Sequence, residues 1–470
     1  MLDNYTSKEN ISILEAIKAI DTNARGVLFI INEENKVIGL LTDGDIRRAI
    51  LNGHELSDSI KSIVNRNFTK GYVGQSSSEL LELCSESILI IPILDENGCL
   101  ADVFHYDSRV HIPVASPNLS GNEFKYLVDA FLSTWISSAG KYINQFETGF
   151  ASFCGVKHGV ATSNGTVAIH LALEAVGIGV GDEVIVPDLT FAATINAVLH
   201  AGATPVIVDI EEESWCIDPS KIEQAITSKT KAIIPVHIYG QPCDMEAIMK
   251  IAKAHNLKVI EDAAEAHGAK FNGQRVGSFG DIACFSFFGN KVITTGEGGM
   301  CITNSDELDE KMRVLRDHGM SKSKKYWHDQ VGYNYRLTNL QASIGVAQLE
   351  RIDQILATKA NYEKSIIEAL KGIDHIEFQR ANIPHRDKIV WLTCILVTNG
   401  KRDEYLTQLK EAGIDARPFF YSLEEMDIFK PFANEKCSVS KRIGAMGMNL
   451  PSSQKLSEET LLTIKNILSK

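Results

Sequence analysis

The chain has 470 residues, of which 44% are hydrophobic and 23% are charged, which is enough apolar material for two or three globular domains. Its formal net charge of −13, without a dense run of Lys or Arg, excludes the charge pattern of proteins that bind nucleic acid or anionic membranes. The nine cysteines form no C-x-x-C pair, and their number is odd, which argues against a disulfide framework and a structural zinc site. The polar N-terminus carries no signal-peptide pattern and the apolar runs are too short to span a bilayer, so we expect a soluble cytoplasmic protein.

The first 110 residues contain a weak internal repeat. Residues 27–50 have the pattern of a strand, a turn, a second strand and a helix. Residues 89–110 repeat the strand, the turn and the second strand. The Glu-Asn turn pair that ends at Asn35 recurs at Asn97, 62 residues further along the chain. This spacing predicts a tandem α/β module at the N-terminus.

The pattern changes after a polar linker with two prolines, at residues 111–122. Nearly continuous apolar strands then alternate with helical stretches, which predicts a mostly parallel sheet covered by helices on both faces. We expect a large α/β domain at 123–350 and a smaller C-terminal domain at 351–470. The chain should end in a helix that Ser457 caps.

Two predicted strand ends carry residues that suit a ligand, because ligands of parallel α/β sheets bind beyond the carboxyl ends of the strands. At Gly165 and Thr166 a strand passes directly into a helix, whose free amides would hold a phosphate. A tight connection without a ligand is the alternative. Glu261 and Asp262 end another strand, where a carboxylate would pair with a cationic ring nitrogen or cap the next turn.

A third strand end lies in the stretch FSFFGNKVITTGEGGM, where Lys291 follows Ser286 among aromatic neighbours. A lysine in such surroundings is partly desolvated, and a neutral amine is the nucleophile that forms a Schiff base with an aldehyde. The glycines of this stretch allow a ligand to approach the backbone closely. A snorkelling surface lysine is the alternative.

Together, the three strand ends describe a site for pyridoxal 5′-phosphate (PLP). This cofactor needs a phosphate cradle, an acid beside its ring nitrogen and a lysine for its aldehyde. Phe191, near a further strand end, would stack on the ring, with ordinary core packing as the alternative.

Residues from about 113 to 470 resemble the PLP-dependent nucleotide-sugar aminotransferases, which have the aspartate-aminotransferase fold type. The matching stretches include ATSNGTVAIHLAL, GDEVIVPDLTFAATINAV, EDAAEAHGA, GSFGDIACFSFFGNKVITTGEGGM and YWHDQVGYNYRLTNLQASIGVAQLE. The resemblance implies a mostly parallel α/β sheet and a C-terminal α+β domain. SFFGNK and YWHDQVGYNYRLTN are most similar to the perosamine-forming branch, which uses glutamate to aminate C4 of GDP-4-keto-6-deoxymannose. A UDP- or dTDP-linked keto sugar and a PLP- or nucleotide-binding regulator remain the alternatives.

The resemblance also implies roles for single residues. Lys291 would form the Schiff base and then move protons, and its presence, where some relatives carry His, favours transamination over dehydration. Asp262 would pair with the pyridine nitrogen, and Glu265 would lie near the ring hydroxyl, where many relatives carry Gln. Asn334 would reach the phosphate of a neighbouring subunit, so a homodimer or a higher homo-oligomer is expected. The remaining cofactor contacts would come from Gly165, Thr166, Phe191 and Ser286.

Four further residues fall in segments that line the substrate site in relatives. Structural support of loops is the alternative for each of them. They are Trp135, His318, Arg336 and Arg417.

The N-terminal repeat resembles a pair of CBS motifs, a module that senses adenine nucleotides. In GLLTDGDIRRAI, Thr42 and Asp45 match the T-x-x-D pattern that holds a ribose or a phosphate. In the second copy Asp107 aligns with Asp45, but Phe104 replaces Thr42. At most one nucleotide site is therefore expected, and ligand sensing and assembly stay open as roles for this module.

Overall fold

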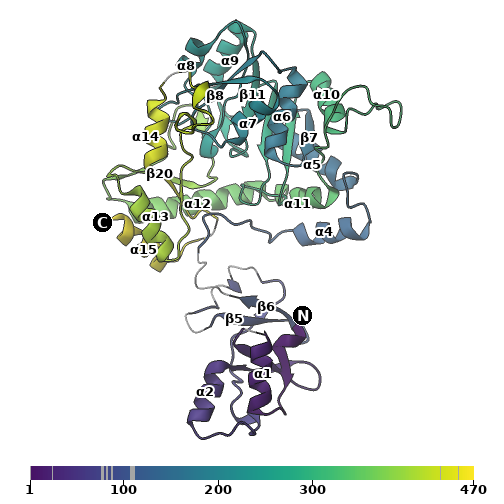
Figure 1. Ribbon diagram of the computed structural model, residues 1–470, viewed down its shortest axis with the longest axis vertical. Helices are drawn as coiled ribbons and strands as arrows, with labels where there is room; N and C mark the ends of the chain where they lie inside the picture. Colours follow the sequence, from purple (N-terminus) through teal and green to yellow (C-terminus); the bar gives the residue numbers. More distant parts are fainter. Residues whose placement is uncertain are drawn as a thin grey trace. The chain divides into compact units, whose positions relative to one another are not determined.

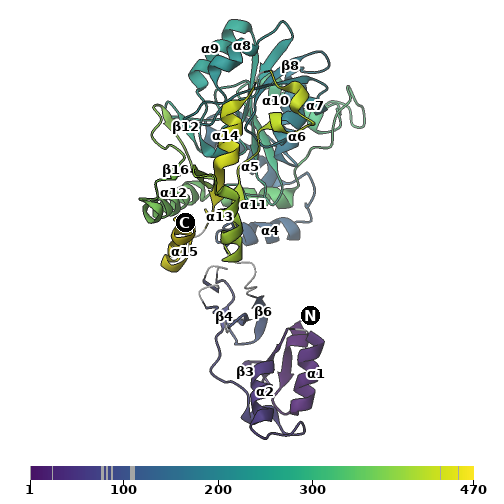
Figure 2. The same ribbon diagram turned by 60° about the vertical axis from the view of Figure 1, so that its left-hand side comes forward.

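The computed structural model describes residues 2–23, 25–75, 79–80, 83–85, 88–105, 112–434, 436–453 and 455–470. The chain divides into two compact units, Met1–His111 and Ile112–Lys470. Figures 1 and 2 show both units from two sides. Within the described residues, no helix is long and apolar enough to cross a lipid bilayer.

The first unit contains two sheets with the same strand pattern. In each sheet the first strand runs parallel to the second, and the second pairs antiparallel with the third. The strands are β1 (Thr6–Lys8), β2 (Val27–Ile31) and β3 (Val37–Thr42), then β4 (Gly71–Tyr72), β5 (Ile90–Leu94) and β6 (Leu100–His105). Both hairpins, β2–β3 and β5–β6, contain an irregularity near their turns. This repeated topology agrees with the repeat predicted from the sequence.

Two helices of the first unit, α1 (Ile13–Asn23) and α2 (Asp43–Leu51), pack on its first sheet. Apolar side chains from both helices share one core with Leu28 and Ile30 of β2. Two short 3-10 helices complete the described elements, η1 (Leu2–Tyr5) and η2 (Ile60–Ser62). Asp107, the predicted second-copy nucleotide residue, lies outside the described residues.

A seven-stranded sheet forms the centre of the second unit, in the order β7-β15-β14-β11-β10-β8-β9. Its strands are β7 (His158–Thr162), β8 (Glu183–Pro187), β9 (Thr204–Val208), β10 (Thr230–Ile233), β11 (Lys258–Asp262), β14 (Ile282–Ser286) and β15 (Gly299–Thr303). Only the pairs that include β15 are antiparallel. The predicted mostly parallel sheet is therefore confirmed.

Alternate residues along each strand of this sheet face two different cores, as the period of two requires. In β11, for example, Val259 belongs to one core and Ile260 to the other. Helices cover both faces, which explains why the strands are nearly continuous apolar runs. One core includes residues of α5 (Lys141–Cys154), α8 (Pro219–Ala225), α9 (Met245–His255) and α11 (Asn339–Leu349), and the other includes residues of α6 (Gly165–Val176), α7 (Ala193–His200) and α10 (Asp306–Arg316).

A smaller antiparallel sheet, in the order β16-β18-β20-β19, has a core of its own in the C-terminal part of the chain. It consists of β16 (Ile376–Phe378), β18 (Thr393–Val397), β19 (Arg417–Pro418) and β20 (Gly447–Leu450). Its core is shared with α12 (Ile352–Leu370), α13 (Arg402–Glu411) and α15 (Glu458–Leu468). Ser457 caps α15 as predicted, since its hydroxyl accepts from the Thr460 amide.

Eight further elements are described in the second unit. They are α4 (Glu123–Leu132), α14 (Ser438–Met446), the short strands β12 (Lys270–Phe271), β13 (Gln274–Arg275) and β17 (Arg386–Asp387), and the 3-10 helices η3 (Ile238–Gly240), η4 (Leu423–Glu425) and η5 (Lys430–Phe432).

Candidate active site

Lys291 lies in the turn that follows β14. Its backbone amide donates to the Phe288 carbonyl at 2.9 Å, and its side chain is only 11% exposed. The Nζ atom lies 3.9 Å from the centre of the Trp391 ring and 3.6 Å from Oε1 of Glu265. The lysine is therefore enclosed by other side chains, and the structure does not support the snorkelling alternative.

Asp262 ends β11, next to the strand that leads to Lys291. Its carboxylate accepts from the Thr194 hydroxyl at 2.8 Å and from the Ala264 amide at 3.1 Å. Burial raises the pKa of Asp262, whereas these hydrogen bonds and the charge of Lys291 act in the opposite direction. Asp262 thus caps the following turn with one oxygen and offers a buried carboxylate near the lysine.

Glu265 links Lys291 to a neighbouring loop. Its Oε2 atom accepts from the Tyr239 amide at 2.8 Å, while Oε1 faces Lys291. Burial raises the pKa of Glu265 to about 7, although the lysine opposes this effect. At a pH above this pKa, the ionised Glu265 carboxylate and Lys291 form the charged centre of the site.

The predicted phosphate cradle lies where α6 meets the end of β14. Asn164 caps α6 by accepting from the Val167 amide at 3.0 Å. A Cβ atom added at Gly165 would lie 2.8 Å from Cβ of Ser286, so only glycine allows the two elements to meet this closely. Thr166 is half-buried in the same first turn. The first-turn amides and the Ser286 hydroxyl together offer donors to an anion.

Phe191 follows β8, and its side chain is 59% exposed. Its ring centre lies 5.6 Å from that of Phe420, which comes from the segment after β19. An aromatic ring this exposed is not ordinary core packing, so the packing alternative for Phe191 is not supported.

Two of the predicted substrate residues lie together with Asn334. Arg336 donates from Nε to the Asn334 side chain at 3.0 Å and from Nη1 to Asp317 at 2.9 Å, and its Nη2 lies 3.2 Å from Nε2 of His318. Trp135, by contrast, is 61% exposed and lies just after α4, and Arg417 begins β19, where it contacts Asp415 at 3.4 Å. Within the described part of the chain, neither Trp135 nor Arg417 forms a hydrogen bond or an ion pair with this group.

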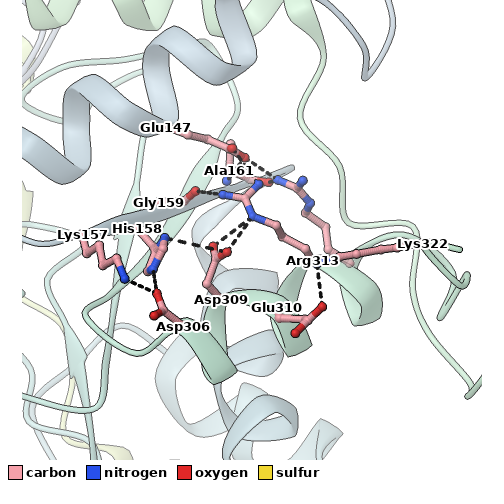
Figure 3. A network of polar contacts seen from close by, with 11 residues as sticks. Glu147, Lys157, His158, Gly159, Ala161, Asp306, Asp309, Glu310, Arg313 and Lys322 are labelled. Atoms are coloured by element: carbon pink, nitrogen blue, oxygen red, sulfur yellow. Dashed lines mark hydrogen bonds and ion pairs between the residues drawn. The ribbon is translucent and has the colours of Figure 1, made fainter.

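A polar network anchors the helix that precedes this group (Figure 3). The buried carboxylate of Glu147 in α5 accepts from Arg313 at 2.9 Å and from Arg316 at 2.6 Å. Both arginines also donate to backbone carbonyls of β7, at Gly159 and Ala161. This network ties α10 to α5 and β7, and so fixes the start of the segment that carries Asn334.

Tyr333 and Tyr335 hold the other end of the segment. Their rings stack with centres 4.7 Å apart, and the Tyr335 hydroxyl lies 3.1 Å from Nδ1 of His170. The alternation of residues along the segment therefore directs Asn334 and Arg336 away from the two tyrosines.

Sequence reasoning missed three residues of the site. The Trp391 ring contacts Lys291, the Tyr239 backbone amide donates to Glu265, and the Thr194 hydroxyl donates to Asp262. The position of Thr194 just after the DLTF stretch, where a strand end leads into a helix, is the local signal that could have indicated it. Nothing near Trp391 in the sequence points to a lysine 100 residues away.

In the first unit, Thr42 and Asp45 bond to each other. Thr42 caps α2, and its hydroxyl and amide donate to the Asp45 carboxylate at 2.7 Å and 2.9 Å. Arg48 donates to the other oxygen of Asp45 at 2.6 Å. The T-x-x-D pattern is thus a capping box, and its polar groups are engaged within the chain.

The residues present fit PLP. The close approach of Gly165 to Ser286 provides a phosphate cradle, Asp262 provides a buried acid, and Lys291 provides an enclosed amine. The exposed ring of Phe191 offers an aromatic face at the same edge of the sheet. Lys291 and Asp262 would hold the aldehyde and the ring nitrogen of the cofactor.

The chain is similar over most of its length to several sugar aminotransferases. The GDP-perosamine synthase of Caulobacter vibrioides is 47% identical over 74% of this chain and 94% of its own length, and that of Escherichia coli O157:H7 is 45% identical over 75% and 96%. A UDP-N-acetyl-3-dehydro-alpha-D-glucosamine 3-aminotransferase of Acidithiobacillus ferrooxidans is 41% identical over 77% and 96%. Among solved structures, the aminotransferase from Psychrobacter cryohalolentis matches with a TM-score of 0.70 and 32% identity, over 75% of this chain and 97% of that one. The Streptococcus pneumoniae protein Spr1654 in its PLP form matches with a TM-score of 0.72 and 28% identity, over 76% and 98%.

Two family models match the chain. The CBS domain model matches residues 1–52, which confirms the resemblance of the first N-terminal copy. The DegT/DnrJ/EryC1/StrS aminotransferase model matches residues 117–469, which confirms the resemblance and the fold predicted for that part. The chain therefore belongs to the DegT/DnrJ/EryC1/StrS aminotransferase family.

Proposed function

We propose that this protein is a PLP-dependent aminotransferase that transfers the amino group of glutamate to C4 of GDP-4-keto-6-deoxymannose and so forms GDP-perosamine. The observation that carries the proposal is the enclosed Lys291 amine, placed beside Glu265 at the strand edge that also presents Asp262. Sequence identities of 47% and 45% to two GDP-perosamine synthases support the choice of sugar and nucleotide.

Bound PLP would supply the aldehyde that carries the amino group and the ring that accepts electrons from the reacting carbon. Lys291 Nζ would take the proton from Cα of glutamate in the first half-reaction and pass it to the cofactor, which would keep the amino group, while water supplies the carbonyl oxygen of the released 2-oxoglutarate. In the second half-reaction the same Nζ donates a proton to C4 of the sugar. The Asp262 carboxylate holds a proton on the ring nitrogen throughout.

The other cofactor contacts position the reacting atoms. Ser286 and the amides of Gly165 and Thr166 bind the phosphate at the N-terminal end of α6, which favours negative charge. Phe191 would cover one face of the ring, and Glu265 would lie near the ring hydroxyl. Fixing the cofactor in this way brings Lys291 within reach of both substrates in turn.

A second copy of the chain would complete the site. Asn334 is exposed, is held by Arg336, and would reach the phosphate bound by the partner. Large apolar side chains on and after α4 are exposed in the single chain, among them Phe124 at 77% and Leu132 at 73%. A homodimer would cover such a surface. Sedimentation of the purified protein tests this proposal, and a monomer at micromolar concentration would contradict it.

Four residues are proposed to bind the nucleotide-linked sugar. His318 and Arg336 would contact the nucleotide-linked sugar from one loop, and Trp135 and Arg417 from two other segments. The His318→Ala and Arg417→Ala variants should raise KM for the sugar nucleotide more than they lower kcat, because these residues would bind the substrate and take no part in proton transfer. A pure loss of kcat would contradict this assignment.

The second candidate is amination of a UDP-linked keto sugar, which the 41% identity to the Acidithiobacillus enzyme favours. The test is to incubate the purified protein with PLP, glutamate and a panel of GDP-, UDP- and dTDP-linked keto sugars, and to read the products by mass spectrometry. Amination of the GDP-linked sugar alone supports the proposal. Amination of the UDP-linked sugar alone refutes it in favour of the second candidate, and no product with any sugar would favour a PLP- or nucleotide-binding regulator.

The N-terminal unit would be the place of regulation, with an adenine nucleotide bound near Thr42. To bind a ribose through Thr42 and Asp45, the capping box would have to open or share its oxygens. Calorimetry with AMP and with ATP tests this directly. Absence of heat with both nucleotides would leave assembly as the role of the unit.

A further inference from the structure

Trp391 makes two contacts at the proposed catalytic lysine. Its side chain is 4% exposed, and the Lys291 Nζ atom lies 3.9 Å from the centre of its ring. Its indole Nε1 donates to the carbonyl of Asn290 at 2.8 Å. One side chain therefore holds both the backbone before the lysine and the amine itself.

The second group at the amine, Glu265, is coupled to Trp391 through Tyr239. The Tyr239 amide donates to Oε2 of Glu265 at 2.8 Å, and its ring stacks on Trp391 with centres 6.0 Å apart and planes at 16°. The two groups that contact Lys291 Nζ are thus held by a common neighbour.

The backbone around Tyr239 fixes the position of the segment that carries Trp391. Tyr239 has a φ of 51°, and Gly240 has a φ of 86°. A Cβ atom on Gly240 would lie 2.4 Å from the carbonyl oxygen of Ile389. The Ile389 amide donates to the Gly240 carbonyl at 3.1 Å. Glycine at this position therefore allows the two segments to meet, two residues before Trp391.

We infer that Trp391 is a positioning residue for the catalytic lysine, because the face of its ring holds the Lys291 ammonium beside Glu265 whenever the amine is not bonded to the cofactor. This inference rests on the role of Lys291 in the proposed function. An aromatic face attracts an ammonium group, and the attraction is strongest for Trp and in desolvated surroundings. The ring therefore stabilises the protonated amine that must donate a proton.

Other titratable groups also act on Lys291. Glu265 faces it directly, and Asp262 and His267 interact with its charge. The carboxylates act in the same direction as the ring, since they favour the charged amine, whereas a charged His267 would act against it. Burial lowers the pKa of His267 to about 3, so this imidazole is neutral at working pH. A test for Trp391 must keep all three groups in place.

The test is competitive acetylation of Lys291 with acetic anhydride in the full-length chain freed of cofactor, followed by mass spectrometry. Acetic anhydride reacts with the neutral amine only. At neutral pH, Trp391→Phe should raise the labelling rate of Lys291 roughly two- to threefold and Trp391→Leu up to about tenfold, because a weaker or absent aromatic face stabilises the ammonium less. At alkaline pH, where the amine is neutral in every variant, the difference should vanish.

Trp215→Phe is the matched control. Trp215 is 3% exposed and packs on Phe419 with ring centres 5.3 Å apart, so its loss disturbs the fold without removing a contact to Lys291. This control should label Lys291 at the wild-type rate. Circular dichroism checks that each variant is folded, and Trp391→Phe, which keeps a packed ring, carries the test if the Leu variant unfolds.

Two results would overturn the inference. Equal labelling of Lys291 in wild type and Trp391→Phe at all pH values would show that the ring does not hold the ammonium. Faster labelling of Lys291 in Trp391→Phe that persists at alkaline pH would show that the Trp391 ring only restricts the access of acetic anhydride to the amine. Labelling needs neither cofactor nor sugar. A wild-type chain that aminates no keto sugar would therefore contradict the proposed function, but the effect of Trp391 on the labelling of Lys291 could still be measured.

Discussion

Replacement of Glu265 by Gln should change how the stability of the cofactor-free chain depends on pH. Burial raises the pKa of Glu265 to about 7 in the folded chain, from an ordinary value of 4.5. At a pH between these two pKa values, Glu265 keeps its proton in the folded chain but has lost it in the unfolded chain. The free energy of unfolding must therefore fall as the pH rises through this window. The difference between the two pKa values corresponds to about 3 kcal/mol.

Glu265→Gln has no proton to lose but can still accept from the Tyr239 amide. We expect the stability of this variant relative to the wild type to rise by about 3 kcal/mol between pH 4.5 and about pH 8. Urea unfolding followed by tryptophan fluorescence at several pH values measures the difference, and effects of other titrating groups cancel in the comparison.

Glu363→Gln is the control for the loss of any buried carboxylate beside a lysine. Glu363 is 8% exposed, and Lys388 donates to it at 2.8 Å. The stability of Glu265→Gln relative to wild type should rise between pH 4.5 and about pH 8, and Glu363→Gln shows what the loss of a buried carboxylate beside a lysine does by itself. A stability difference between Glu265→Gln and wild type that stays constant from pH 4.5 to about pH 8, or that falls, would refute the reasoning about a buried, protonated Glu265.

Four further substitutions test the site and the first unit. Lys291→Ala should keep the fold by circular dichroism but lose the visible absorbance of lysine-bound cofactor and all transamination; retained turnover would contradict its role. Thr194→Val removes the 2.8 Å bond to Asp262 and should weaken PLP binding about tenfold, as measured by fluorescence titration, since hydrogen bonds to charged groups stabilise by about 1.5–3 kcal/mol. Gly165→Val should weaken PLP binding at least as strongly, because its Cβ would clash at the phosphate cradle, and unchanged affinity would argue against that cradle. Thr42→Ala should destabilise the first unit by about 1 kcal/mol through loss of its cap, with PLP binding unchanged.

The parts of the site that follow from local patterns could be predicted from the sequence. Asp262 and Ser286 end apolar strands, and Gly165 opens a helix directly after a strand, so the rule for ligands at parallel sheets places all three at one edge. Lys291 follows one of these strands within five residues. The order of the strands was not needed for this inference, because the carboxyl ends of parallel strands share an edge.

The parts that depend on distant contacts could not be predicted. Trp391 meets Lys291 from a segment 100 residues away, which lies against Gly240 at Ile389, and no local pattern reports such a contact. Thr42 and Asp45 show the opposite case. Their spacing suits both a ligand motif and a capping box, and the structure shows the capping box.

The most direct test of the central proposal follows the nitrogen atom itself. The purified full-length protein is incubated with PLP, GDP-4-keto-6-deoxymannose and glutamate labelled with nitrogen-15, and the sugar nucleotide is analysed by mass spectrometry. We predict that the label appears in GDP-perosamine with the wild-type chain and not with Lys291→Ala. A GDP-linked sugar that stays unlabelled with the wild-type chain, under conditions in which PLP is bound, would contradict the proposed function.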